Sequence, residues 1–198
     1  MGKRIHLDMI ESFFEKSPVV DFNSIERIIR SKKKVKHYAK KLVSQLLKRG
    51  KIKRLAKGYY TKFDDITLSV FCFQPAYLGL QDSLSAHELW EQETIPIILT
   101  SRKTNPGIRV ITGGNVMVKR IDKKYVFGIE YLKQGDFYFP YSDIEKTFID
   151  MIYFKQYIDK EVIKEFKRKI DKKKLNSYLK LYPKRFRKIV LKRIGRLN

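Results

Sequence analysis

One face of a helix expected over residues 34–49 gathers side chains that could bind a polyanion. Lysine and histidine donate hydrogen bonds to phosphate oxygens, and short or bidentate donors near a helix start can reach base edges in the major groove of DNA. On a helical wheel, Val35, Ala39, Leu42 and Leu46 fall together on the opposite side and should face a core. An ordinary amphipathic helix whose lysines only face water is the alternative. The candidate DNA contacts in and just before this helix are Lys33, Lys34, Lys36, His37, Lys40, Lys41, Ser44 and Lys48.

A second group of cations follows in a predicted two-stranded hairpin. Apolar and cationic residues alternate over residues 51–55, which indicates a strand with one wet side, and residues 59–61 return as its partner. We expect Lys53, Arg54 and Lys57 to contact phosphate or the minor groove. We expect Tyr59 and Tyr60 to pack against the helices as core, because aromatics that stack on bases usually lie exposed on a sheet face.

Two further helices must hold these groups in place. Apolar residues at helical spacing predict a first helix over residues 5–15, which Ser17-Pro18 ends. Asn23 is a good N-cap for a short second helix, with residues 31–34 as the following turn. Gly50 should end the third helix in the left-handed conformation. Three helices and a β-wing predict a winged helix-turn-helix domain over residues 1–62.

The pattern changes after Asp64-Asp65, which we take as a domain boundary. Residues 66–73, 95–99, 108–111, 116–119 and 125–129 are typical of strands, with a hairpin turn at 112–115 and a helix at 82–90. Four amphipathic helices are expected from Ser142 onward, the first capped by Ser142 or Asp143 and the last begun by Pro183. We therefore predict an α+β protein, with a mixed sheet-and-helix C-terminal domain at residues 63–198.

The positive charge is divided between the two ends of the chain. Of the formal net charge of +23, residues 1–62 carry +13, residues 63–139 carry −1 and residues 140–198 carry +11. A second basic surface is expected on the last helix, opposite Phe186, Ile189, Val190 and Ile194, where it would contact flanking DNA. An acidic surface of a partner protein, a nucleic-acid substrate of that partner and a merely solvated face are the alternatives. The residues of this surface are Lys184, Arg185, Arg187, Lys188, Lys192 and Arg196.

Other chemistries find little support in the sequence. A single cysteine, Cys72, excludes an intramolecular disulfide and a Cys-rich zinc site, and its apolar neighbours indicate a small buried residue. The three histidines do not pair at metal-ligand spacing, and no phosphate loop or nucleophile elbow is present, so we expect neither a metal nor a cofactor. Asp143, Glu145 and Asp150 near Lys146 suggest a nuclease, but a helix cap with an exposed acidic stripe is simpler. No apolar run is long enough to span a membrane, and we expect a cytoplasmic protein.

Three segments resemble a known family. Residues 47–60, L-K-R-G-K-I-K-R-L-A-K-G-Y-Y, resemble the wing of AbiEi-type transcriptional regulators, the antitoxins of type IV toxin–antitoxin systems. Residues 75–78 with 83–89 look like that family's strand-to-helix segment, and residues 139–152 resemble its E-K-x-x-x-D helix. The matches come in the family's order over about residues 20–155. The basicity of the last helices is not part of the family pattern.

The resemblance implies a winged helix that binds inverted repeats in its own promoter, and a C-terminal domain that counteracts a nucleotidyltransferase-type toxin. It also implies that the chain is not an enzyme. We therefore expect a sequence-specific autorepressor that binds double-stranded DNA and acts as an antitoxin. A regulator of another operon without a toxin partner is the first alternative, and a nucleic-acid-processing enzyme such as a nuclease is the second.

Overall fold

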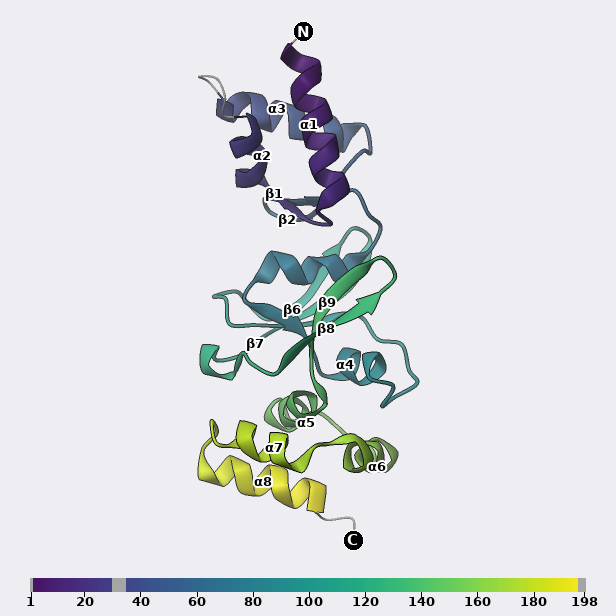
Figure 1. Ribbon diagram of the computed structural model, residues 1–198, viewed down its shortest axis with the longest axis vertical. Coiled ribbons are helices and arrows are strands. Elements are labelled where there is room, and N and C mark those ends of the chain that lie inside the picture. Colours follow the sequence, from purple (N-terminus) through teal and green to yellow (C-terminus); the bar gives the residue numbers. More distant parts are fainter. Residues whose placement is uncertain (1, 30–34, 196–198) are drawn as a thin grey trace. The chain divides into compact units, whose positions relative to one another are not determined.

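The computed structural model describes residues 2–29 and 35–195, without the side chains of residues 2–8, 35 and 36. Backbone packing divides the chain into two compact units (Figure 1). The first comprises Met1–Cys72 together with Val110–Asn115, and the second comprises Phe73–Arg109 and Val116–Asn198. Each unit has elements of both kinds, so the chain is a mixed α+β protein. Within the described ranges, no helix is long and apolar enough to cross a membrane.

The first unit combines three helices with a small antiparallel sheet. The helices are α1 (Gly2–Lys16), α2 (Phe22–Ile29) and α3 (Val35–Lys48), and the strands are β1 (Val20–Asp21), β2 (Lys53–Ala56) and β3 (Tyr59–Thr61). The strand order is β1-β3-β2, so the hairpin β2–β3 is joined to the segment that leads into α2. A core formed by all three helices and the hairpin includes Ile10, Phe14, Val20, Ile25, Ala39, Leu42, Leu46, Ile52 and Tyr60. Burial of Tyr60 confirms that this tyrosine packs as core, whereas Tyr59 is only half-buried and is not part of this core.

The ends of the helices in this unit agree only partly with the sequence signals. Gly50 adopts φ +66°, and the amides of Gly50 and Lys51 donate to Leu47 O and Leu46 O, which confirms the predicted end of α3. The predicted cap of α2 is wrong by two residues. Asp21, and not Asn23, caps this helix, because its Oδ1 accepts from Ser24 N at 3.1 Å.

The second unit is built on a mixed six-stranded sheet with the order β6-β7-β5-β4-β9-β8. The strands are β4 (Ala76–Leu78), β5 (Ile97–Thr100), β6 (Gly107–Ile111), β7 (Gly114–Arg120), β8 (Ile129–Gln134) and β9 (Phe137–Ser142). Strand β5 runs parallel to β7 and antiparallel to β4, and β4 runs parallel to β9. The short helix α4 (Gln81–Ala86) lies between β4 and β5 in the chain.

Two predicted strands are wrong. The apolar residues 66–73 form the 3₁₀-helix η1 (Ile66–Phe73), because Asp65 begins a helical turn: its carboxylate accepts from Thr67 N at 2.8 Å. Residues 125–129 are not a strand either, since the 3₁₀-helix η2 (Lys123–Tyr125) is capped by Asp122 and Gly128 then turns with φ +63°. Strands β8 and β9, which the sequence pattern did not predict, pair over Ile129–Gln134 and Phe137–Ser142.

Four helices gather on one side of this sheet (Figure 1): α5 (Ile144–Tyr153), α6 (Lys160–Lys169), α7 (Lys172–Leu179) and α8 (Lys184–Gly195). Asp143, Asp159 and Asp171 cap the first three, each accepting from backbone amides of the first turn. The core between helices and sheet includes Tyr77, Leu99, Phe148, Phe166, Leu175, Tyr182 and Val190. This core fixes α5 against β4 and β9.

Candidate nucleic-acid interface and a buried polar network

Helix α3 presents an exposed polar face. His37, Lys40, Lys41, Ser44 and Lys48 are all exposed, while Ala39, Leu42 and Leu46 on the opposite side are buried. Within the described part of the chain, none of the five exposed side chains takes part in a hydrogen bond or an ion pair. Their donors are therefore available to a ligand.

The β2–β3 hairpin carries three cations that were predicted to contact DNA, and they differ in pairing and exposure. Lys53 forms an ion pair with the exposed Asp64, so its ammonium is partly neutralised. The Arg54 guanidinium is exposed and donates from Nε to Ala56 O at 3.3 Å, two residues further along the same strand. Lys57 is exposed at the turn itself, beside Gly58 with φ +83°. Arg54 and Lys57 are therefore the more accessible of the three.

Several predicted contacts fall outside what the structure describes. Lys33, Lys34 and Arg196 lie outside the described residues, and Lys36 lies in α3 without a described side chain. These positions therefore stay predictions.

The residues predicted to form the second basic surface, on α8, are not all exposed to the same degree. Lys184, Arg185, Lys188 and Lys192 are exposed, as the helical wheel predicts. Arg187 has a different role, because its guanidinium donates to Tyr182 O and Lys180 O, both at 2.7 Å, and so binds the carbonyls that follow α7. Ile189, predicted to lie inside, is 49% exposed, because it sits about 100° around the helix from the buried Val190.

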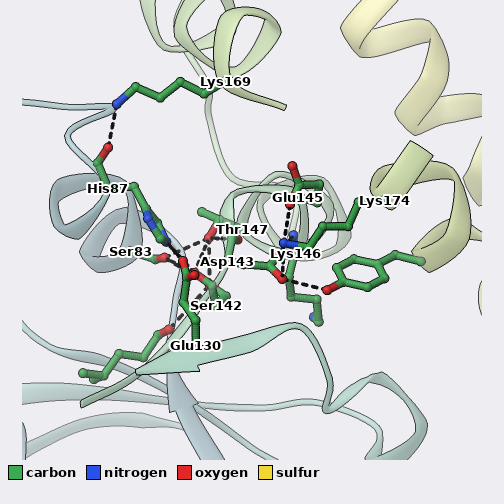
Figure 2. A network of polar contacts seen from close by, with 12 residues as sticks. Ser83, His87, Glu130, Ser142, Asp143, Glu145, Lys146, Thr147, Lys169 and Lys174 are labelled. Carbon is green, nitrogen blue, oxygen red and sulfur yellow. Dashed lines mark hydrogen bonds and ion pairs between the residues drawn. The ribbon is translucent and has the colours of Figure 1, made fainter. Parts of the chain in front are cut away.

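A buried polar network lies where β9 meets α5 (Figure 2). The Ser142 hydroxyl lies 3.1 Å from the Ser83 hydroxyl and 2.8 Å from the Thr147 hydroxyl, and the last two lie 2.8 Å apart. Ser142 O also receives the His87 ring at 2.7 Å, with Glu130 at 3.5 Å on the same nitrogen. His87 therefore joins the end of α4 to β9, which is a structural role.

The acidic residues at the start of α5 bind α7. The Asp143 carboxylate caps α5 through Lys146 N and also accepts from the Tyr178 hydroxyl at 2.7 Å. Glu145 accepts from Asp171 N at 2.8 Å, and Lys174 bridges Glu145 and Asp143 at 3.0 and 3.2 Å. Burial and the hydrogen bond to Asp143 raise the pKa of Tyr178 to about 12. Partial burial opposes the charge of Lys174, but its hydrogen bond to Glu145 and the pull of Asp143 raise its pKa overall.

One turn further along α5, a lysine and an aspartate are buried together. Lys146 and Asp150 are both 0% exposed and form an ion pair, while the Tyr77 hydroxyl donates to Asp150 Oδ2 at 2.7 Å and accepts from Lys146 Nζ at 2.9 Å. Burial raises the pKa of the Asp150 carboxyl and lowers that of the Lys146 ammonium, and their mutual attraction offsets part of both shifts.

The predicted exposed acidic stripe on this helix is therefore wrong. Asp143, Glu145 and Asp150 are 5%, 4% and 0% exposed, and each is engaged by a backbone amide, a lysine or a tyrosine. With these groups buried and paired, the arrangement fastens α5 to β4 and α7. The sequence did show the Lys146–Asp150 spacing of four residues and the Asp143 cap, but spacing alone does not distinguish a buried pair from an exposed one. In the described ranges, no group of three or more His, Cys, Asp or Glu could hold a metal ion.

Comparison with known proteins gives a fold likeness. No protein-family model matches the sequence, and no curated protein matches it. The crystal structure of the RV2827C protein from Mycobacterium tuberculosis is similar, with a TM-score of 0.57 at 10% sequence identity, covering 96% of this chain and 78% of that chain. At this identity the likeness shows a shared fold alone, and function must be argued from the site.

Proposed function

We propose that this chain is a sequence-specific DNA-binding transcriptional regulator whose first unit acts as a winged helix-turn-helix module. The observation that carries the proposal is the exposed face of α3, where His37, Lys40, Lys41, Ser44 and Lys48 present donors without a partner among the residues that the structure describes. In this module α3 would enter the major groove and the β2–β3 hairpin would lie along the backbone.

Two features of the first unit support this assignment. The same small core holds α3 and the hairpin, so Arg54 and Lys57 are carried on the body that presents the α3 face. Residues 1–62 of this unit also carry +13 of the net charge, which supplies the field that brings a polyanion to them.

The more specific proposal is an autorepressing antitoxin of a type IV toxin–antitoxin system, acting in the cytoplasm on a nucleotidyltransferase-type toxin. The resemblance of residues 47–60, 75–78 with 83–89, and 139–152 to AbiEi-type regulators supports it. Operator DNA with inverted repeats would be the ligand, with no cofactor and no catalysis. A gene for such a toxin beside this one, and rescue of growth when both are expressed, would support the antitoxin role. Lack of rescue would leave a regulator of another operon.

A salt titration of DNA affinity tests the interface. Each phosphate neutralised contributes about −0.9 to the slope of log K against log salt, so Lys40→Ala with Lys41→Ala should flatten the slope by about 1.8. Lys123→Ala with Lys124→Ala removes the same charge from the neutral middle of the chain and serves as the matched control. Equal slopes for both double variants would contradict the α3 interface.

Selection of sites from a random DNA pool tests sequence readout. A residue that contacts a base is worth about 1–3 kcal/mol at its own base pair, so His37→Ala and Lys40→Ala should each relax preference at one position. The same preferred site from wild type and both variants would overturn readout by this face. Cleavage of DNA by the pure protein with a divalent metal would favour the enzyme alternative.

A further inference from the structure

A groove with an aliphatic floor and a cationic rim lies on the second unit, between the end of α5 and α8. Its volume is about 340 Å³. It is lined by three isoleucines, three cations and one amide: Ile152, Ile158, Ile189, Lys155, Lys192, Arg193 and Gln156.

The floor of this groove is apolar and offers little to a nucleic-acid base. Ile189 is 49% exposed, although it is apolar and its neighbour on the same helix, Val190, is fully buried. The amide of Gln156 is already engaged, since its Nε2 donates to Phe154 O at 2.9 Å and its Oε1 accepts from Gln81 at 3.1 Å. A base edge placed here would lose its hydrogen bonds to water and regain few, whereas an aliphatic or aromatic side chain would gain from burial.

The rim carries a lysine in a strained backbone conformation. Lys155 ends α5 with φ +53°, where its amide donates to Ile152 O at 3.1 Å and the amide of Gln156 donates to Met151 O at 2.8 Å. Glycine adopts this conformation freely, while another residue costs about 1 kcal/mol or more. The chain keeps a cation at this position against that cost, and strained residues of this kind cluster at functional sites.

Two more cations line the same groove. Lys192 is exposed, and Arg193 donates from Nη2 to Ile158 O at 3.3 Å, which ties it to a residue of the groove. Carboxylates are the side chains that match such a group of cations.

We propose that this groove docks an acidic segment of a partner protein, with one large apolar side chain on the isoleucine floor and flanking carboxylates on Lys155, Lys192 and Arg193. A protein segment fits better than duplex DNA, because the bases of an intact duplex are paired and stacked and offer no apolar projection that would fill a recess on the protein. The proposal concerns the second unit only and does not depend on DNA binding by α3.

The test uses the full chain and two fluorescein-labelled peptides. The first is an eight-residue peptide of Asp and Glu with a central Leu-Phe pair, and the second replaces that pair by Ser-Ser. The first should bind at least about tenfold more tightly, because burying the apolar pair is worth that factor or more. Equal affinity of the two peptides would overturn the proposal.

Two variants locate the site. Ile189→Ser should weaken the Leu-Phe peptide at least about tenfold, while Leu191→Ser, a control on the same helix that is 44% exposed and outside this groove, should leave it unchanged. Both side chains are exposed enough that neither change should unfold the protein. Equal effects of the two variants would place the peptide elsewhere and sink the idea.

A third variant separates function from folding. Lys155→Gly relieves the left-handed strain, so the midpoint of urea unfolding should rise while peptide affinity falls several-fold. Unchanged affinity would mean that Lys155 serves only the end of α5. A single-stranded oligonucleotide of equal charge serves as the competitor. If it displaces the peptide, and if Ile189→Ser does not change the affinity of the oligonucleotide, the surface binds nucleic acid and the proposal fails.

Discussion

Helices α3 and α5 both carry lysines at helical spacing, yet they use them in opposite ways. Lys40 and Lys41 of α3 are exposed and make no ion pair with any residue that the structure describes, while Lys146 of α5 is fully buried against Asp150 and Tyr77. The fold explains the second arrangement, since a buried charge must be paired. The fold does not explain the exposed lysines of α3. These lysines therefore serve either the binding of an external partner or the solubility of the protein. The comparison separates charges that serve folding from charges that are free to serve binding.

The largest expected effect comes from breaking the buried pair. Asp150→Ala leaves Lys146 charged and unpaired in the core, which should cost about 3–5 kcal/mol of unfolding free energy in urea. Replacing both partners, Lys146→Met with Asp150→Leu, should recover most of that loss. The exposed pair Lys164–Glu161 is the control, and Lys164→Ala should cost under about 0.5 kcal/mol. Similar losses for Asp150→Ala and Lys164→Ala would erase the distinction between the two kinds of charge.

A glycine that closes the same network should come next. Gly128 has φ +63°, and an added Cβ would lie 2.9 Å from both Lys146 Cβ and Tyr178 Cε2. Gly128→Ala should therefore cost about 2–4 kcal/mol, from backbone strain and from displacement of those side chains. Gly135 has φ +57° with nothing within 4 Å of an added Cβ, so Gly135→Ala isolates the strain alone, about 1 kcal/mol. If the two variants unfold at the same urea concentration, the close packing around Gly128 has no energetic weight.

A partly buried carboxyl at the start of α4 should make stability depend on pH. Burial raises the pKa of Asp82 from 3.8 to about 7, although Ile97 N and Tyr141 donate to it. The folded state holds the proton of Asp82 more tightly than the unfolded state does. The protonated carboxyl therefore contributes its full stabilisation of the folded state below about pH 4, and this stabilisation is lost as the pH rises to about 7. Asp82→Asn mimics the protonated form and should remove that loss.

The difference in unfolding free energy between Asp82→Asn and wild type should then grow by on the order of 2 kcal/mol between pH 4 and 7, less than the whole shift would give because the side chain is partly exposed. Above pH 7 the difference should stay level. A difference that does not vary with pH would show that Asp82 titrates normally in the folded protein.

The smallest expected effect on stability belongs to the exposed face. Lys40→Ala with Lys41→Ala should change unfolding free energy by less than about 0.5 kcal/mol, since both side chains are exposed and neither has a partner in the described part of the chain. The same variant should lose DNA affinity and flatten the salt dependence. Loss of stability together with loss of binding would make the α3 lysines structural and would dissolve the contrast with α5.

Amphipathic periodicity predicted the helices well, because each buries one stripe and is bounded by local signals. Gly50 at the end of α3 and Asp143 at the start of α5 are such signals, and both are confirmed. Strands were less predictable. Residues 66–73 are apolar and rich in β-formers, but a short apolar run does not separate a strand from a buried helix, and Asp65 decides the outcome by starting η1.

The polar network was the hardest feature to predict from the sequence. Its partners come from α4, β4, β9, α5 and α7, and contacts such as Ser83 with Thr147 or Tyr77 with Asp150 join residues 64 and 73 positions apart. The Gly135-Asp136 turn signal could have revealed the β8–β9 hairpin, but no local pattern shows that Lys146 is buried. The α3 lysines were predictable because exposure on one helix face follows from the wheel alone.

The tip of the β6–β7 hairpin, residues 110–115, belongs to the first unit although the strands around it belong to the second. Gly114 there lies so close to Ile66 that an added Cβ would come within 2.8 Å of Ile66 Cδ1. The first unit is therefore interrupted in the gene: a fragment that stops at residue 72 lacks residues 110–115, which belong to its own fold, and a fragment that stops at residue 62 also lacks residues 63–72. Recombination or protease nicking between the two units would not release an intact first unit, and a swap of that unit between related proteins would have to carry the hairpin tip with it.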